Sequence, residues 1–112
     1  DSLHMTPGDR GKVLAACRAA REKRGVVTHG TDTLVETAKL LGRELDGSGK
    51  TVVLTGAMVP YAFGSSDGLF NLGAALAYAQ ALPAGVWVAM NGQAFPCGKV
   101  RKDRRLARFV AL

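Results

Sequence analysis

The spacing of apolar residues along the chain predicts three helices that alternate with three strands. Apolar residues recur at helical spacing in three segments, which we expect to be helices at about 7–24, 33–45 and 67–82. Short apolar runs between them predict strands at 26–28, 50–55 and 86–90. In the second strand successive residues are apolar, which indicates a strand covered on both faces. The alternation of strands and helices favours an α/β protein.

Capping residues and buried positions of these helices follow from the same pattern. Thr6 suits the cap of the first helix, Thr33 with Glu36 fits a capping box at the second, and Asp67 is a candidate cap for the third. The positions expected to face inward are Val13, Leu14, Cys17 and Ala20 in the first helix, Leu34, Ala38, Leu41 and Leu45 in the second, and Leu72, Leu76 and Ala79 in the third.

We therefore expect an open parallel sheet with helices on both faces, a Rossmann-like arrangement of three βα units. Its three strands make a small sheet, so further strands are expected from elsewhere. The segment after Asn91-Gly92 is expected to be an irregular basic tail. The loops at 30–32, at 56–57 and from 91 onward all follow strands, and the carboxyl ends of parallel strands meet at one edge, where ligands bind. These loops should therefore lie together.

Composition and charge narrow the classes of partner. The 112 residues suit one domain, and no apolar run approaches the ~20 residues that cross a bilayer, so no membrane partner is expected. The net charge is +6, with six of the 15 Lys and Arg residues between Lys99 and Arg108. A basic segment can bind nucleic acid, but it is more often a solvated face, so nucleic acid is not the expected partner. Cys17 and Cys97 have no metal-binding or redox spacing.

The candidate chemistry lies where the first strand turns into the second helix. The hydroxyl of Thr31 and the carboxylate of Asp32 follow a strand and precede a helix start, which favours anionic ligand groups. If Thr33 caps the helix, both side chains are available for a ligand, and the corner is a plausible active site. The alternative is that Asp32 caps the helix and Thr31 fills a turn.

Four segments, in the same order along the chain, resemble the bacterial-type L-asparaginases. The stretch 27–38 is similar to the second signature of this family. Residues 1–6 resemble its substrate loop. The segment that follows the next strand in the family is similar to residues 54–60, 66–68 and 71–72. The region that carries the family's catalytic lysine is similar to residues 90–92 and 100–102. The resemblance covers nearly the whole chain and is closest to the short asparaginase-like proteins that lack the usual second domain.

The resemblance implies hydrolysis of the side-chain amide of asparagine, or of a related small amide, to the acid and ammonia through a threonine acyl-enzyme. It implies no metal and no cofactor. Thr31, Asp32 and Lys102 would handle the protons, with Lys102 able to accept one only as the neutral amine, a form that burial favours. Without the resemblance, Lys102 is expected to be one more solvated charge in a basic run.

The same resemblance implies a set of substrate contacts. Asp32 would hold the substrate's α-ammonium group and orient Lys102, and the Thr31 N–H could serve the oxyanion. The remaining substrate-binding positions are Ser2 and Leu3 in the substrate loop, the backbone around Gly30 for the α-carboxylate, and the Ala57 carbonyl, which would face the leaving nitrogen.

The chain also departs from the family pattern. The family's first signature, a strand followed by Thr-Gly-Gly-Thr, supplies its primary nucleophile and does not occur in this sequence. We therefore interpret residues 1–112 as an N-terminal-type asparaginase domain without its first strand and nucleophile loop, inactive by itself. The alternative is a catalytically silent amino-acid-binding or regulatory module of the same fold. By analogy with relatives we expect a homo-oligomer, and we expect a cytoplasmic location.

Overall fold

The computed structural model describes residues 2–59 and 65–112, which form a mixed sheet with helices on both faces. The four-stranded sheet has the order β1-β2-β3-β4, with β1 (Arg24–Thr28), β2 (Thr51–Thr55) and β3 (Gly85–Met90) parallel and β4 (Gln93–Pro96) antiparallel to β3. A second sheet is the antiparallel pair β5 (Val100–Asp103) and β6 (Arg108–Ala111). The helices are η1 (Ser2–His4), a 3-10 turn, α1 (Pro7–Ala19), α2 (Leu34–Glu44) and α3 (Gly68–Ala81).

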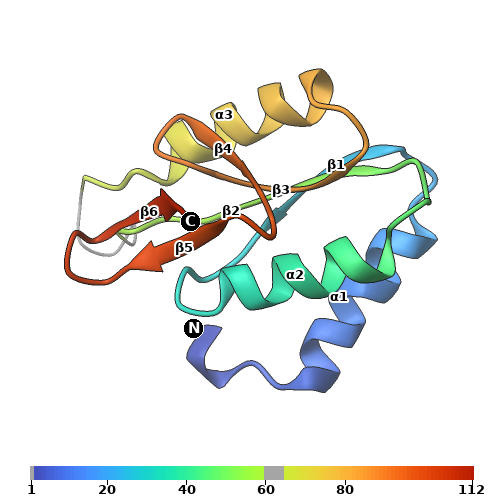
Figure 1. The fold of residues 1–112 in the computed structure, drawn as a ribbon, viewed down its shortest axis with the longest axis horizontal. Helices are drawn as coiled ribbons and strands as arrows, with labels where there is room; N and C mark the ends of the chain where they lie inside the picture. The colour runs from blue at the N-terminus through green and yellow to red at the C-terminus, as the bar shows by residue number, and fades with distance from the viewer. Residues whose placement is uncertain (1, 60–64) are drawn as a thin grey trace.

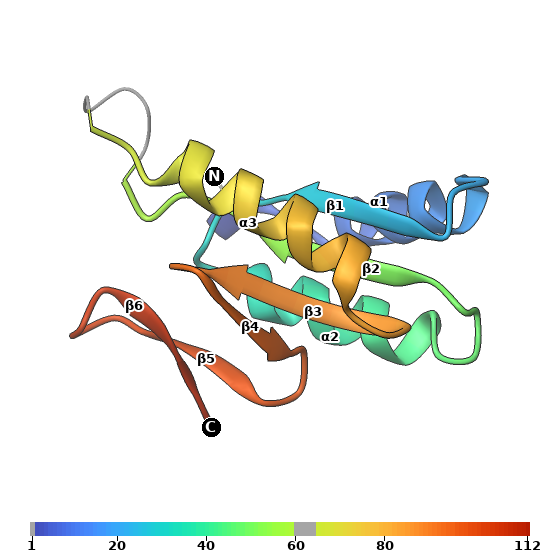
Figure 2. The same ribbon diagram turned by 90° about the horizontal axis from the view of Figure 1, so that it is seen from above.

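The helices cover the main sheet in two layers, as Figures 1 and 2 show: α3 lies on one face, and α1 and α2 lie on the other. The larger core lies under α1 and α2 and the smaller one, around Val53 and Ala89, lies under α3. Every residue of β2 is buried, as expected for a strand covered on both faces. The predicted α/β class is therefore confirmed, with the correction that one strand of the sheet is antiparallel.

Helix α2 packs as its apolar spacing predicts. Its inward residues Leu34, Ala38 and Leu41, and Leu45 just after it, are all buried. They belong to one cluster with side chains of β2 and β3 such as Leu54. This amphipathic helix, which leads directly from the Thr31–Asp32 loop, fixes that loop to the sheet.

Helix α3 is rotated relative to the prediction. Leu72 is only half-buried and Leu76 is 50% exposed, whereas Asn71 and Ala75 are fully buried together with the predicted Ala79. Two features determine the buried face. Asn71 makes hydrogen bonds to the loops after β2 and β3, and the small alanines allow close packing on the sheet. Apolar spacing alone therefore identified Ala79 correctly and wrongly placed Leu76 on the inward face.

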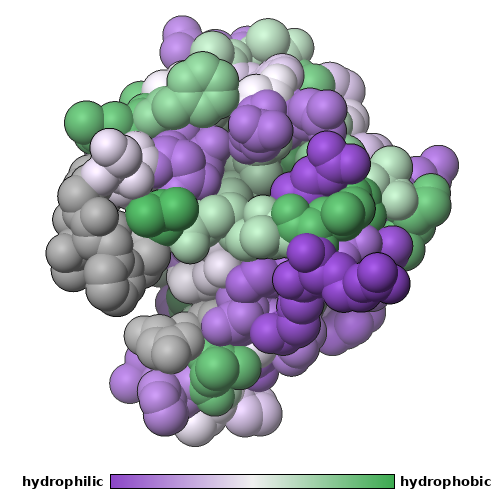
Figure 3. Space-filling view, turned by 90° about the vertical axis from the view of Figure 1, so that its left-hand side faces the viewer, coloured by the Kyte–Doolittle hydropathy of each residue, from purple (hydrophilic) through white to green (hydrophobic). Residues whose placement is uncertain are grey.

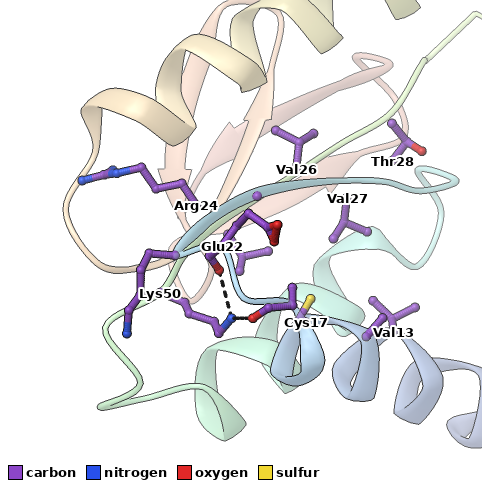
Figure 4. A pocket seen from close by; sticks show the side chains of 13 residues that line it. Val13, Cys17, Glu22, Arg24, Val26, Val27, Thr28 and Lys50 are labelled. Carbon is purple, nitrogen blue, oxygen red and sulfur yellow. Dashed lines mark hydrogen bonds between the residues drawn. The ribbon is translucent and has the colours of Figure 1, made fainter.

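Helix α1 ends earlier than the predicted residue 24, and Ala20 is exposed rather than inward. The Lys50 ammonium group donates to the carbonyls of Ala20 and Glu22, which holds the chain out of the helix (Figure 4). From Arg24 onward the backbone pairs with β2 instead. A tertiary contact and strand pairing therefore override the helical propensity of residues 21–23.

The capping box forms at the first helix and not at the second. Thr6 and Asp9 exchange both hydrogen bonds of a capping box at the start of α1. Thr33 is the N-cap residue of α2 but makes no side-chain cap bond, and Glu36 pairs with Arg10 of α1 at 3.3 Å. The predicted Thr33–Glu36 box is therefore wrong, because the glutamate is used between helices.

The predicted irregular tail is wrong, because the segment forms three strands. Asn91 and Gly92, at φ 53° and 78°, form the tight turn that connects β3 to β4, and Asn-Gly is a preferred pair for turns with two positive φ values. In the following hairpin, Val100 of β5 and Phe109 of β6 are buried in the larger core. The hairpin is thus anchored against α2 and its neighbours.

Candidate active site

The loops after β1 and β2 touch each other at the carboxyl edge of the sheet. The His29 N–H donates to the Thr55 carbonyl at 2.9 Å. Gly56 stands so close to this loop that a Cβ atom there would lie within 3.0 Å of the His29 carbonyl oxygen, nearer than real Cβ atoms come. The predicted meeting of these two loops is therefore confirmed, and it depends on glycine at position 56.

Asn71 of α3 connects these loops to the one after β3. Its Nδ2 donates to the Gly56 carbonyl at 2.8 Å, and its Oδ1 accepts from the Asn91 N–H at 3.0 Å. Asp67 holds the same amide group through a 2.9 Å bond from Nδ2 to its Oδ2. The sequence analysis missed this bridging role, although two polar residues four apart in an otherwise apolar helix are a usable signal.

Asp67 stands at the cap position of α3, as predicted, but its carboxylate is used elsewhere. It accepts from the N–H groups of Met58 and Val59 at 3.1 and 3.0 Å. Partial burial alone would raise the pKa of Asp67, but these donors outweigh burial and hold the pKa below its ordinary value. The charged Asp67 therefore fixes the loop after β2.

Lys102 of β5 reaches the corner formed by Thr31 and Asp32. Its Nζ donates to Thr31 Oγ1 and to Asp32 Oδ1, both at 2.8 Å, across separations of 71 and 70 residues. The side chains of Lys102 and Asp32 are 15% and 25% exposed. The structure thus brings together a hydroxyl, a carboxylate and an amine at the sheet edge. The N-cap residue of α2 is Thr33, so the alternative in which Asp32 caps this helix is wrong.

Arg104 is a further cation at this corner that the sequence analysis did not single out. Its Nη1 donates to the same Asp32 oxygen at 2.9 Å, and its side chain is 65% exposed. The hydrogen bond from Lys102 is the main cause that lowers the pKa of Asp32 from its ordinary value, and the charges of both cations add to it. The carboxylate is therefore charged and paired.

His29 connects the Thr31 loop to α2. Its Nδ1 lies 2.6 Å from the Gly30 carbonyl, to which it donates, and its Nε2 lies 2.8 Å from the Thr37 hydroxyl. These contacts give His29 a local hydrogen-bonding role at the start of α2. The bond to the Gly30 carbonyl also means that this part of the predicted substrate site already has a partner within the chain.

The other predicted binding positions lie at the same end of the molecule. The η1 turn with Ser2 and Leu3 lies near the loop that enters α2 in both ribbon views (Figures 1 and 2), and Leu3 is exposed. Ala57 is half-buried in the loop after β2. Figure 3 views the molecule from this end and shows strongly hydrophilic residues beside a hydrophobic group.

The structure contains one cavity between α1 and β1 and another at the carboxyl edge of the sheet. A cavity of about 510 Å³ lies between α1 and β1 and is lined by apolar residues such as Val13 and Val27 together with Lys50 (Figure 4). A second, of about 260 Å³, lies at the sheet edge between Met58, Asn91 and Phe109.

Within residues 2–59 and 65–112 no cluster of three potential metal ligands occurs, and no helix is long and apolar enough to cross a bilayer.

The fold and the corner define an α/β protein whose hydroxyl, carboxylate and amine lie at the strand ends. The family model described as the N-terminal part of asparaginase matches residues 1–108. The chain therefore belongs to the asparaginase family.

Individual relatives are similar in sequence and in structure. The chain is 39% identical to L-asparaginase 1 of Escherichia coli (strain K12) over 74 residues, which are 64% of this chain and 22% of that protein. It is 42% identical to the glutaminase-asparaginase of Acinetobacter glutaminasificans over 80 residues, 69% of this chain and 24% of that protein. The thermostable L-asparaginase from Thermococcus kodakarensis superposes with a TM-score of 0.92 at 32% identity and covers 100% of this chain. The chain spans 35% of that structure and less than a quarter of these two curated relatives.

Proposed function

We propose that this chain provides the proton-handling and substrate-binding corner of an asparaginase-type amidohydrolase. The observation that carries the proposal is the pair of 2.8 Å contacts from Lys102 Nζ to Thr31 Oγ1 and Asp32 Oδ1. The reaction is hydrolysis of the side-chain amide of asparagine, or of a related small amide, to the acid and ammonia.

In the proposed reaction a threonine oxygen bonds to the amide carbon and its proton passes to a base. The carbon–nitrogen bond then breaks, the nitrogen takes up a proton and leaves as ammonia, and water splits the resulting ester. Lys102 is the proposed base, because its Nζ lies within reach of the Thr31 hydroxyl; its ammonium group must first give up a proton, and Asp32 orients it. The threonine that forms the ester in the family belongs to a Thr-Gly-Gly-Thr motif, which these 112 residues do not contain.

The proposed substrate contacts surround this corner. The Thr31 N–H would donate to the oxyanion, and the Ala57 carbonyl would accept from the departing nitrogen. The carboxylate end of the substrate would be bound by Ser2, Leu3 and the backbone at Gly30. The ammonium group of the substrate would be bound by Asp32. The support for this set is its common place at the carboxyl edge of the sheet, where ligands of such sheets bind.

Ammonia release by the full-length gene product tests the proposal. Lys102→Met should lower kcat by about 10²–10⁴-fold, the usual contribution of a positioned base. Lys99→Met, which removes an exposed lysine outside the corner, is the matched control and should leave kcat unchanged. Amide binding without turnover in the unaltered full-length product would overturn the hydrolase and favour the silent binding module.

The 112-residue chain by itself should bind the amide without releasing ammonia. Thr31→Val should weaken binding measured by calorimetry, because it removes the hydroxyl from the corner, whereas Thr28→Val on the exposed end of β1 should not. Ammonia release by the chain alone that is lost in Thr31→Val would contradict the proposed inactivity.

Assembly and location are part of the same proposal. Leu69, Phe70 and Leu76 of α3 are exposed apolar side chains, which supports a homo-oligomer that sedimentation velocity would detect. We propose a cytoplasmic location. One relative, from Haemophilus influenzae, is named a probable periplasmic L-asparaginase, so cell fractionation with recovery in the periplasm would overturn this part.

A further inference from the structure

The loop after β2 lies directly beside the Thr31 corner. A Cβ atom at Gly56 would stand 3.3 Å from Thr31 Cγ2, tighter than most contacts that Cβ atoms make. Ala57, the next residue, is half-buried. No donor among the described residues bonds to its carbonyl oxygen. The loop therefore brings a backbone acceptor without a partner in the described chain to the edge of the corner.

The start of α3 holds the peptide groups on both sides of Ala57. Before it, the Gly56 carbonyl accepts from Asn71 Nδ2 at 2.8 Å. After it, the Met58 N–H donates to Asp67 Oδ2 at 3.1 Å. Asn71 is fully buried, and Asp67 is the N-cap residue of the helix. The backbone of Ala57 is therefore fixed by a packed helix on both sides.

The contact with Asp67 also determines where the Ala57 carbonyl points. This carbonyl and the Met58 N–H belong to one peptide group, which is trans. In a planar trans peptide the C=O and N–H bonds point in opposite directions. Because the N–H is turned toward Asp67, the Ala57 carbonyl must point away from Asp67.

The charge of Asp67 is needed for this contact. Three donors converge on its two oxygens: the N–H groups of Met58 and Val59, at 3.1 and 3.0 Å, and Asn71 Nδ2, at 2.9 Å. An ionised carboxylate only accepts hydrogen bonds, so it suits three donors. A side-chain amide of the same size has one acceptor oxygen and would turn its own N–H groups toward them. Asp67→Asn therefore cannot hold the same peptide groups.

We propose that Asp67 is a positioning residue: by holding the Met58 N–H, it orients the Ala57 carbonyl toward the departing nitrogen of the substrate amide. The inference rests on the proposed function, to which it adds the residue that sets the direction of this carbonyl. The carbonyl accepts a hydrogen bond from the amide nitrogen and itself forms or breaks no covalent bond. The carbon–nitrogen bond breaks, and the nitrogen takes up a proton and leaves as ammonia, as in the proposed reaction.

This contact acts on turnover rather than on substrate binding. A hydrogen bond strengthens when its donor becomes charged, so the Ala57 carbonyl binds the nitrogen more strongly as the nitrogen takes up its proton. An interaction that is stronger in the transition state than in the ground state raises kcat and has little effect on KM. The charged groups of the substrate are proposed to contact Ser2, Leu3, Gly30 and Asp32, none of which Asp67 touches.

A comparison of an amide with an ester tests the proposal in the full-length gene product. Asparagine and the β-methyl ester of aspartate share the same carboxylate and ammonium groups, but the leaving oxygen of the ester has no N–H to donate to Ala57. Values of kcat and KM are measured for both substrates. Ser66→Ala is the matched control, because the Ser66 hydroxyl contacts the Val59 carbonyl and the Gly68 N–H, which lie outside the Ala57–Met58 peptide.

Asp67→Asn should lower kcat for asparagine by about 10–10²-fold, in line with the cost of misplacing a group by about 1 Å, and leave KM nearly unchanged. It should leave kcat/KM for the ester nearly unchanged, whereas a general structural defect would lower both substrates alike. Ser66→Ala should keep the ratio of amide to ester activity. Asp67→Ser retains a residue suited to the N-cap of α3, should change the ratio in the same direction, and serves if Asp67→Asn fails to fold, which thermal denaturation shows.

Hydrogen exchange in the 112-residue chain tests the contact without turnover. The Met58 amide should exchange with deuterium about tenfold faster or more in Asp67→Asn, because a hydrogen bond to a charged group typically contributes more than a factor of ten. Ser66→Ala should leave this rate nearly unchanged. An exchange rate of Met58 that Asp67→Asn does not alter would overturn the contact on which the proposal depends.

Two further results would overturn the proposal while the proposed function stands: equal losses for the amide and the ester in Asp67→Asn, or asparagine turnover that neither substitution of Asp67 lowers. Absence of ammonia release from asparagine by the unaltered full-length product would overturn the proposed function itself, and this inference with it.

Discussion

Gly56 is the residue at which the loops after β1 and β2 meet. Because a Cβ atom there would clash with the His29 carbonyl oxygen, Gly56→Ala should push apart the loops that carry the corner. We expect a destabilisation of about 1–3 kcal/mol, the usual cost of overpacking, measured by urea denaturation. The same change at Gly73 in α3, where a Cβ would meet nothing within 4 Å, should instead stabilise by about 0.5–1 kcal/mol. Equal effects at the two glycines would contradict the proposed close approach.

The titration of Asp32 reports directly on its contact with Lys102. Since the hydrogen bond from Lys102 is the main cause that lowers the pKa of Asp32, Lys102→Met should raise that pKa toward its ordinary value. Carboxyl-carbon NMR across the acidic range measures it. Asp9 is the internal control, because its pKa is lowered mainly by the Thr6 backbone N–H at the start of α1. A midpoint for Asp32 that Lys102→Met leaves in place would contradict the contact.

Stability should depend on pH through the same carboxylate. A pKa that is lower in the folded state than in the unfolded chain stabilises the protein above the unfolded value, near pH 3.9, and this contribution is lost as the pH falls through the folded value. The thermal denaturation midpoint of the unaltered chain should therefore fall on acidification by more than that of Asp32→Asn. Parallel curves for the two proteins would show that the pairing of Asp32 does not contribute.

At the scale of elements, α3 is positioned by a polar residue. Asn71 is fully buried and binds the Gly56 carbonyl and the Asn91 N–H. Asn71→Leu, of similar size, leaves both groups without this partner and should destabilise by about 1–3 kcal/mol for each buried group left unpaired. Urea denaturation measures the loss. Gln80→Leu, on the exposed side of the same helix, is the control and should be nearly neutral.

The elements differ in how far the sequence predicts them. The large apolar residues of α2 lie on one side of the helix, so the spacing alone predicts that Leu34, Ala38 and Leu41 are buried. In α3 nearly every side chain is apolar or small, so spacing does not identify a face, and the hydrogen bonds of Asn71 decide it. The end of α1 depends on Lys50, a residue far along the chain, which no local pattern contains.

The strands after β3 were missed for a different reason. Asn91-Gly92 is itself a hairpin signal, but the basic residues that follow suggested a solvated tail. In β5 and β6 the buried Val100 and Phe109 lie among exposed arginines, so each short strand offers a single inward side chain. Alternation over four residues with one apolar position is too brief to predict a strand.

At the scale of the whole molecule, the meeting of the strand-end loops could be predicted from the order of the elements alone. The place of Lys102 could not, because it depends on how a hairpin outside the main sheet packs against it. In the sequence analysis its role came only from the family resemblance. Arg104 had no signal beyond the basic run, since a guanidinium group paired with a distant carboxylate looks in sequence like any other surface charge.

Several basic residues serve structural contacts, which bears on nucleic-acid binding. Arg24 donates to the Ala79 and Leu82 carbonyls at the end of α3, and Lys50 holds the end of α1. With Lys102 and Arg104 paired to Asp32, the net charge of +6 overstates the free cationic surface. We expect no DNA affinity that falls steeply with salt, as fluorescence anisotropy between about 50 and 200 mM salt would show. A steep loss over that range would contradict this expectation.

The amine of the corner is carried by a two-stranded hairpin, whereas the hydroxyl and the carboxylate follow the main sheet. A pair of strands by itself is at best marginally stable, so β5 and β6 depend on Val100 and Phe109 remaining in the core. We therefore expect the hairpin to detach before the main sheet unfolds. On warming, the chain should lose ligand affinity before it loses its circular dichroism signal, and the backbone amides of β5 should exchange with deuterium sooner than those of β2.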